Sequence, residues 1–385
     1  MLHPSFDIAA FLRDSWQKRP LLIKNPWADW QNPLAPDELA GLACEADVES
    51  RLIARNGGRA NGRLVCEHGP IDATRFGRLG KKHWTLLVQA VDHHVPAVAA
   101  LIEPFRFVPN WRIDDVMVSY AVDGGGVGAH FDQYDVFLIQ GLGIRRWRVG
   151  QACDASTALL PHDDLRLLAD FTPTAEYWLE PGDMLYLPPG TAHDGVAVGD
   201  DCMTYSIGFR APACSELISD WADHVASQLP QDDRYTDPGL RLQDNPGEIA
   251  PDAIAALHGL VTAKLQDRAG FARWFGEFTT TPKYAEIDWR PDVPLESADL
   301  RQRLASAALH RNPASRFSFI RHGSDAVWLF VDGECFDCRD ASAVFATRIC
   351  ANTALVVDAP VLSSDAALAV ITQLYNQGSV SFDPA

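Results

Sequence analysis

The chain has 385 residues, of which 47% are hydrophobic, and this length and composition predict two or three globular domains. Its formal net charge of −18 argues against a protein whose affinity comes from neutralising nucleic-acid phosphates, and it favours a basic partner. The start of the chain carries charges within its apolar stretches, and no apolar run is long enough to span a bilayer, so we expect a cytoplasmic protein without membrane contact.

The first part of the chain, to about residue 100, mixes expected helices with shorter apolar runs. The segments 36–47 (PDELAGLACEAD) and 84–105 (WTLLVQAVDHHVPAVAALIEPF) are typical of helices. Short β-rich runs separated by Gly and Pro turns then extend from residue 116 to residue 209. Such a pattern is typical of a β-barrel or a β-sandwich.

The pattern changes again near residue 211, where it becomes helical. Leu217, Trp221 and Val225 recur every four residues, and a similar apolar stripe runs from Ile254 to Leu265. The segment 290–294 (RPDVP) is typical of a linker. We therefore divide the chain into three domains, 1–211, 212–291 and 292–385.

The last of these domains has the pattern of a small α+β unit. A helix is expected around residues 300–304, followed by strands at 316–321, 326–331 and 335–338, and by a last helix over 363–377. The Asp332-Gly333 pair between two apolar runs predicts a hairpin turn. We therefore interpret the C-x-x-C pair, Cys335 and Cys338, as part of a hairpin strand rather than a metal or redox site, because a structural zinc site needs two further ligands at matching spacing.

An H-x-D motif, His130 and Asp132, begins the most informative stretch of the sequence, GAHFDQYDVFLIQGLGIRRWRVG. On a β-strand, residues i and i+2 project to the same side, so the imidazole and the carboxylate are expected to converge. A second H-x-D, at His162 and Asp164, lies in a charged segment without a strand pattern. We interpret this second copy as a solvated loop.

A third candidate ligand follows in EPGDMLYLPPGTAHDG, where a turn, a strand and a rigid Pro-Pro-Gly present His193. Two histidines and one carboxylate leave half an octahedron open, which is the arrangement of non-haem Fe(II) oxygenases. Zinc is a less natural occupant, because catalytic zinc usually takes His-rich tetrahedral sets. The alternative is that His130 and His193 are hydrogen-bonded core histidines.

These motifs, together with FLRDSWQKRPLLIKN before them and YSIGFRAP after them, resemble the bacterial ribosomal oxygenases of the cupin/JmjC superfamily. The resemblance covers residues 6–212 at motif level, and it matches the rest of the chain by layout. It implies an α+β protein with a double-stranded β-helix catalytic domain, a helical dimerisation region and a winged-helix-like C-terminal domain. It further implies Fe(II), 2-oxoglutarate and O2 chemistry that hydroxylates an arginine side chain of a large-subunit ribosomal protein.

Carried over by position, the resemblance assigns iron to His130, Asp132 and His193, and 2-oxoglutarate to Arg145 and Ser119. An arginine suits the far carboxylate of 2-oxoglutarate, because its guanidinium donates paired hydrogen bonds in a dry pocket. The residue pattern alone does not choose between Arg145 and its neighbours Arg146 and Arg148. No catalytic residue beyond the metal centre is expected.

A guanidinium substrate needs a carboxylate or aromatic partner near the cavity mouth. Asp123, beside the glycines 124–126, is our candidate, with Tyr134 and Asp194 as weaker ones. The alternative for Asp123 is a turn-capping aspartate.

The apolar helices of residues 212–290 predict a homodimer, and direct nucleic-acid binding is not expected, because the segment 295–311 has only a small excess of basic residues. Rival functions remain open within and outside this enzyme class. They are a histidyl hydroxylase, a lysyl demethylase, a non-catalytic cupin regulator with a winged-helix tail, and a metal-dependent isomerase or sugar-binding cupin.

Overall fold

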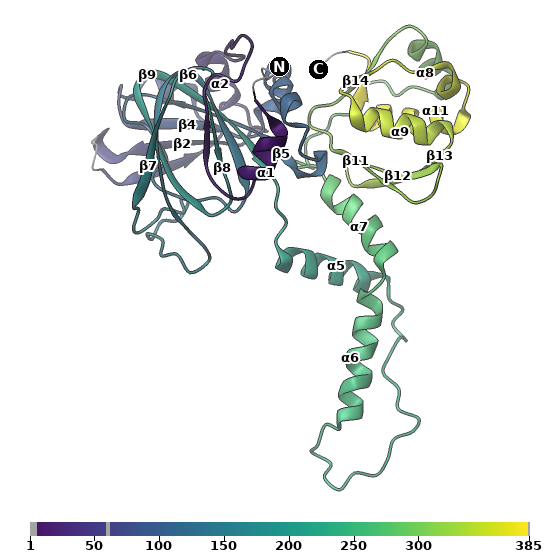
Figure 1. Cartoon of the computed structure of the whole chain (residues 1–385). Helices are drawn as coiled ribbons and strands as arrows, with labels where there is room; N and C mark the ends of the chain where they lie inside the picture. The colour runs from purple at the N-terminus through teal and green to yellow at the C-terminus, as the bar shows by residue number, and fades with distance from the viewer. Residues whose placement is uncertain (1–5, 59–61, 384–385) are drawn as a thin grey trace.

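A computed structural model describes residues 6–58 and 62–383, and it shows three parts (Figure 1). A β-barrel domain holds the N-terminal half of the chain, a helical arm projects away from it, and a small α+β domain lies beside the barrel. The fold is therefore α+β, with a cupin-like barrel as its largest part. In the described part of the chain, no helix combines the length and the hydrophobicity that crossing a membrane requires.

The barrel is a nine-stranded antiparallel sheet in the order β1-β8-β6-β9-β5-β4-β2-β3, with β7 paired to β6. Its strands are β1 (Leu21–Ile23), β2 (Ser50–Arg55), β3 (Leu64–His68), β4 (Trp84–Val88), β5 (Ile113–Ala121), β6 (Asp135–Ala152), β7 (Pro173–Leu179), β8 (Met184–Leu187) and β9 (Thr191–Phe209). The register shifts along the β6–β9 pair near Leu142, where both long strands bend. These bends wrap the sheet around the functional site.

Short helices cover one face of the sheet and close the main core. They are α1 (Ile8–Asp14), α2 (Pro36–Leu42), α3 (Ala73–Phe76) and α4 (Pro96–Ala99), with 3-10 turns at Asn56–Gly58, Val91–His93, Ala100–Phe105 and Asn110–Arg112. Phe11 of α1 packs on Phe137 of β6 and on Tyr186 of β8. At its start β6 is buried on both faces, because Val136 and Leu138 belong to a second apolar cluster inside the barrel.

The helix expected over residues 84–105 is wrong for its first part. Residues Trp84–Val88 form β4, which pairs with β2 on one side and β5 on the other. The run TLLV carries no helix-specific signal, and the ladder hydrogen bonds of two neighbouring strands decide its conformation. Only Pro96–Ala99 of this segment is α-helical.

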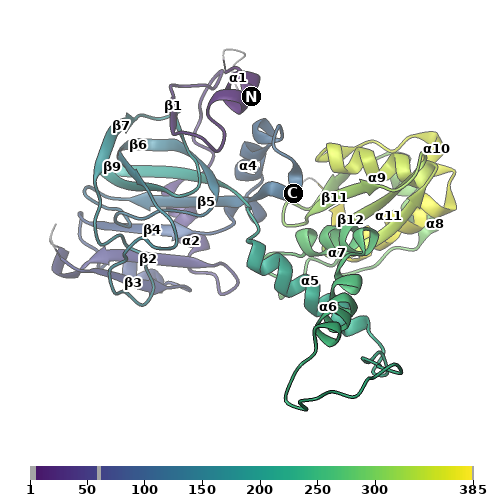
Figure 2. The same ribbon diagram turned by 60° about the horizontal axis from the view of Figure 1, so that its bottom comes forward.

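The helical arm consists of α5 (Cys214–Gln228) and α6 (Pro251–Leu265), as the apolar periodicity predicts, and α7 (Arg268–Thr280) follows α6. The Trp221 indole nitrogen donates to the Leu265 carbonyl, which ties α5 to the end of α6. In both ribbon views α5 and α6 extend away from the rest of the chain (Figures 1 and 2). In contrast, α7 packs on the C-terminal domain, where Gly276 lies against the ring of Phe330.

The C-terminal domain contains two three-stranded sheets, β14-β10-β15 and β11-β12-β13. Its elements are α8 (Ser297–Leu304), β10 (Leu309–Arg311), β11 (Phe317–Arg321), β12 (Ala326–Val331), β13 (Glu334–Arg339), α9 (Ala341–Ala351), β14 (Ala354–Leu355), α10 (Ala359–Leu362), α11 (Asp365–Asn376) and β15 (Val380–Ser381). The Asp332-Gly333 hairpin is confirmed, and both residues have positive φ, 50° and 86°, as a type I′ turn needs. Cys335 and Cys338 lie on opposite faces of β13, because they are three positions apart on the strand.

Candidate active site

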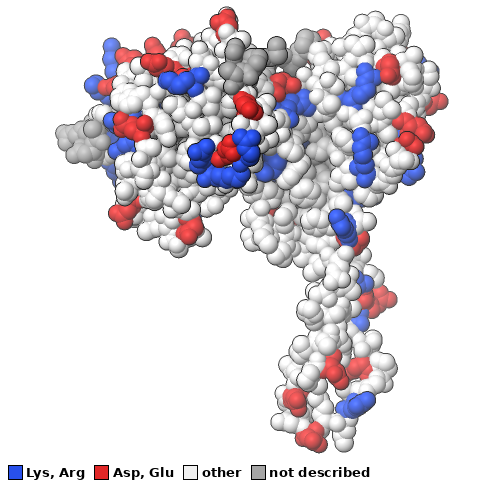
Figure 3. Space-filling view, in the orientation of Figure 1, with Lys and Arg blue, Asp and Glu red and all other residues white. Residues whose placement is uncertain are grey.

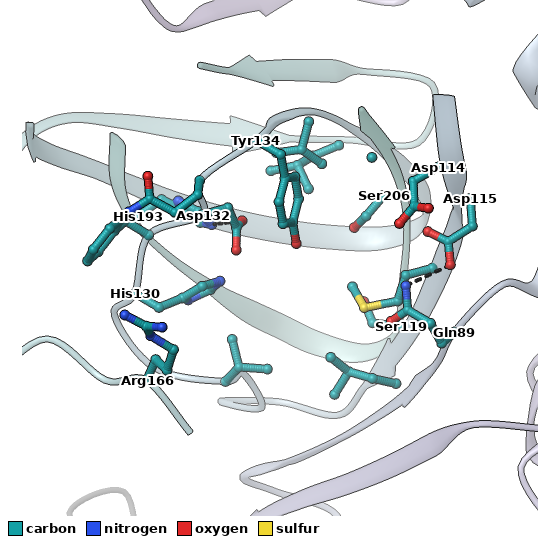
Figure 4. Close-up of a pocket in the computed structure, with 18 of the residues that line it drawn as sticks. Gln89, Asp114, Asp115, Ser119, His130, Asp132, Tyr134, Arg166, His193 and Ser206 are labelled. Carbon is teal, nitrogen blue, oxygen red and sulfur yellow. Dashed lines mark hydrogen bonds and ion pairs between the residues drawn. The ribbon is translucent and has the colours of Figure 1, made fainter. Parts of the chain in front are cut away.

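A cavity of about 730 Å³ opens into the barrel, and residues of β5, β6 and β9 form its walls. Figure 4 shows His130, Asp132 and His193 together at one end, with Asp114, Asp115 and Ser206 at the other. The loop 164–167 contributes a further wall. The cavity is therefore long enough to bring two chemically different groups of side chains into one space.

His130, Asp132 and His193 offer ligand atoms that all lie within 4.8 Å of one another. The strand alternation expected for the H-x-D motif is not what brings them together, since Asp132 lies in the loop before β6. Instead His130 forms an isolated antiparallel bridge with His193, through N–H···O bonds of 3.0 and 2.8 Å. The Pro-Pro-Gly turn also contributes, because the Gly190 amide donates to the Asp132 carbonyl at 2.7 Å.

The two imidazoles are oriented for a metal. His130 Nδ1 donates to the Gly128 carbonyl and His193 Nδ1 donates to the Thr191 carbonyl, each at 2.9 Å. Since a carbonyl only accepts, Nδ1 carries the proton and Nε2 presents its lone pair to the site. Burial, and then the neighbouring His130, lower the pKa of His193 to about 4, so its imidazole is neutral at physiological pH. This donor set fits Fe(II) with three open positions.

Arg145 and Ser119 meet in the same cavity, as expected. The Arg145 side chain is 5% exposed, and its Nη1 donates to the Ser119 hydroxyl at 3.2 Å. Its guanidinium lies 5.5 Å from the centre of the Trp147 ring. Side-chain alternation along β6 distinguishes Arg145 from the neighbouring arginines. Arg145 points inward with Trp147, whereas Arg146 and Arg148 are on the other face.

Comparison with known proteins identifies the family. The chain is 38% identical to the ribosomal protein uL16 3-hydroxylase of Escherichia coli over 377 residues, 97% of both chains. The chain belongs to the ribosomal oxygenase family. A probable ribosomal oxygenase of Haemophilus influenzae is also 38% identical, over 69% of this chain and 66% of its own. Family models match a JmjC domain at residues 100–217, a ROXA-like winged helix at 263–381 and an AraC-like ligand binding domain at 174–271.

Solved structures give the same family. The X-ray structure of Escherichia coli YcfD matches with a TM-score of 0.89 and 36% identity, covering 100% of this chain and 99% of that one. A second YcfD structure, described as a ribosomal oxygenase in complex with cobalt and 2-oxoglutarate, matches with a TM-score of 0.86 over 100% of both chains. The fold of this ribosomal oxygenase is therefore a JmjC barrel followed by a winged-helix domain. A domain boundary at residue 292 stays a prediction, because the winged-helix match begins before α7.

Asp123 of this ribosomal oxygenase lies outside the cavity wall. Its carboxylate forms an ion pair with Lys82 at 3.1 Å and accepts a hydrogen bond from the Gly199 amide at 3.1 Å. This is the position of the turn-stabilising alternative, and a substrate-binding role for Asp123 stays an untested prediction. Asp194 is paired with Arg148, whereas Tyr134 does line the cavity (Figure 4).

The acidic end of the cavity was not predicted from the sequence. Asp115, Met117 and Ser119 all line it, as residues on one face of β5 do. Lys283 donates to Asp115 at 2.8 Å and to Asp114 at 3.2 Å. Asp115 is four positions before Ser119, so strand alternation alone would have put the two on one face. Nothing in the sequence places Lys283 beside Asp115.

The second H-x-D does lie in a loop, but this loop is braced rather than freely solvated. His162 Nε2 donates to the Leu64 carbonyl, and its Nδ1 accepts from the amides of Asp164 and Leu165. Asp164 pairs with His68 of β3 at 2.9 Å, and Cys66 lies near both. These contacts fix the 164–167 wall of the cavity.

Proposed function

We propose that this protein is a cytoplasmic Fe(II)- and 2-oxoglutarate-dependent hydroxylase, acting on an arginine side chain of a large-subunit ribosomal protein. The observation that carries the proposal is one cavity that holds a His-Asp-His ligand set and a buried arginine. The names of the relatives support the ribosomal substrate, and the YcfD complex with cobalt and 2-oxoglutarate supports the cosubstrate.

His130, Asp132 and His193 would hold Fe(II), which with 2-oxoglutarate and O2 supplies the oxidising power to hydroxylate an unactivated C–H bond. Arg145 would bind the far carboxylate of 2-oxoglutarate, with the Ser119 hydroxyl as a neighbour. Because Arg145 and Ser119 are buried, water competes poorly with a charge-assisted bond there, and the bond is correspondingly strong.

The acidic end of the cavity suits a guanidinium. We propose that Asp115 and Asp114 receive the substrate side chain, and that the ring of Tyr134, between them and the metal ligands, guides it (Figure 4). Lys283 pairs with both carboxylates and Arg316 pairs with Asp114, so a substrate cation has to compete with these two side chains. Such competition favours arginine, whose planar group bridges two carboxylates, over lysine.

The helical arm supports a homodimer. On α6, Ile254 and Val261 are 53% and 58% exposed, and Leu257 lies between them. Ile218 of α5 is 63% exposed. The space-filling view shows uncharged surface along the middle of the arm, with acidic and basic side chains near its lower end and along one edge (Figure 3). An exposed apolar stripe is costly in water, and a second copy related by a two-fold axis would cover it.

The decisive experiment incubates the protein with Fe(II), 2-oxoglutarate and ribosomal proteins from its own cell, followed by mass spectrometry. We expect a mass increase of one oxygen atom on an arginine of one large-subunit protein, dependent on 2-oxoglutarate. Oxygen on a histidine would replace the arginine assignment with a histidyl hydroxylase, and loss of methyl groups from lysine would replace it with a demethylase. Absence of 2-oxoglutarate turnover with every substrate would favour a non-catalytic cupin.

A further inference from the structure

A second cavity, of about 290 Å³, lies between the barrel domain and the C-terminal domain, and it contains no residue of the metal-ligand set. One wall comes from residues 92–114 of the barrel domain, and the other comes largely from residues 310–318. Figure 2 shows α4 on the side of the barrel domain that faces β11. Any molecule bound here would contact both domains at once.

Arg311, at the end of β10, carries an unpartnered side-chain nitrogen on the wall of this cavity. Its Nε is buried and has no hydrogen-bond partner among the described residues. Its guanidinium lies 4.4 Å from the centre of the Phe317 ring, which fixes its position without supplying an acceptor. Buried polar groups without partners are rare in folded proteins, because each costs free energy, and they call for an explanation such as a bound ion.

The acidic groups at this cavity are already engaged. Glu103 pairs with Arg106 at 3.2 Å, and Asp114 pairs with Arg316 at 2.7 Å. Asp92 accepts from the Val116 amide at 2.8 Å. Burial raises the pKa of the Asp92 carboxyl to about 8, which keeps it largely uncharged at neutral pH.

Arg311 itself stays charged. Burial lowers the pKa of its guanidinium to about 10, which is still well above physiological pH. The acidic groups that act on its charge are Glu103 and Asp332, but Glu103 is paired with Arg106 and Asp332 accepts a hydrogen bond from the Ser379 hydroxyl at 2.6 Å. Ser318 adds a hydroxyl to the wall, while Ile102 and Pro313 add apolar surface.

We propose that the interdomain cavity binds a small organic anion through a carboxylate or phosphate group received by Arg311. The apolar wall would cover the rest of the molecule. This site is separate from the 2-oxoglutarate site, and its walls belong to two domains. A bound anion would therefore hold the winged-helix domain against the barrel and raise the stability of the whole chain, because it binds only the folded arrangement.

The test uses the full-length protein with its 2-oxoglutarate site saturated, so that a probe bound at Arg145 is not counted. Inorganic phosphate and acetate are the probes, and chloride at equal ionic strength is the reference. Calorimetric titration and the unfolding temperature are measured for the parent and for Arg311→Met. Arg321→Met is the matched control, because this arginine lies over Phe319 on an exposed part of β11.

We expect phosphate, acetate or both to bind the parent and Arg321→Met, and at least tenfold weaker binding to Arg311→Met with unchanged 2-oxoglutarate turnover. Phosphate alone would identify a phosphorylated ligand, and acetate alone a carboxylate. Equal effects on all three proteins, or no binding to the parent, would overturn the proposal. If Arg311→Met does not fold, Ala99→Phe, which fills the cavity and keeps Arg311, must show the same loss of binding.

Discussion

Backbone groups hold much of the proposed metal-ligand set in place. The Nδ1 atoms of His130 and His193 donate to carbonyls two residues earlier in the chain, and the Asp132 carbonyl accepts from Gly190. Backbone contacts of this kind survive substitution of a neighbouring side chain. Removing one ligand should therefore remove the metal without disturbing the barrel.

The variants His130→Ala, Asp132→Ala and His193→Ala should each abolish 2-oxoglutarate turnover, because each removes one of three protein ligands. Far-ultraviolet circular dichroism should stay unchanged. Asp163→Ala is the control, because Asp163 is an exposed carboxylate in the neighbouring loop, and it should keep parental turnover. A ligand variant with full turnover would show that its residue does not bind the metal.

Arg145 is the second residue whose role can be measured by itself. Arg145→Ala should raise the KM for 2-oxoglutarate by on the order of 100-fold, since a buried charge-assisted pair contributes roughly 2 to 4 kcal/mol. Arg145→Lys should restore only part of the affinity, because an ammonium cannot form the paired contact. Arg146→Ala, on the outer face of β6, is the matched control. An unchanged KM in Arg145→Ala would show that another cationic residue binds the far carboxylate of 2-oxoglutarate.

At the scale of elements, α7 has a different environment from α6 although the two helices are consecutive. Gly276 of α7 faces the Phe330 ring, and an added Cβ would lie 2.4 Å from a ring atom. A Cβ at Gly259 of α6 would meet none of the described residues within 4 Å. One helix is therefore part of the C-terminal core, and the other is part of the arm.

This difference predicts opposite effects of the same substitution. Gly276→Ala should lower the stability, because overpacking costs about 1 to 3 kcal/mol and exceeds the gain of about 1 kcal/mol in helix propensity. Gly259→Ala should raise the stability by up to about 1 kcal/mol, because only the propensity changes. Denaturant unfolding measures both. Shifts of the same sign would mean that α7 is not packed on β12.

At the scale of the whole molecule, assembly follows from the apolar stripe of α6. Light scattering at micromolar concentration should give a mass of about twice 42.3 kDa. Leu257→Glu combined with Val261→Glu should give a monomer, because two charges in an apolar interface are costly to desolvate. Val344→Glu, at an exposed apolar residue of α9, is the control and should leave the dimer intact. A parental mass near that of one chain would contradict the dimer.

Features that depend on near neighbours in the chain could be predicted from the sequence. The Pro-Pro-Gly turn before His193, the Asp332-Gly333 hairpin and the amphipathic helices after residue 211 depend on local geometry, which spacing and turn chemistry report directly. The H-x-D spacing identified the two ligand candidates, but their approach depends on the bridge between His130 and His193. The resemblance to ribosomal oxygenases added the choice of Arg145, and the inward register of β6 agrees with it.

The remaining features depend on contacts between segments that are distant in the chain. Residues 84–88 form a strand because β2 and β5, which are distant in the chain, provide its ladder partners. Lys283 contacts Asp115, which is 168 residues away in the chain, and Arg311 lines the interdomain cavity. Desolvation and the pairing of charges depend on which surfaces meet, and no local pattern in the sequence encodes that meeting.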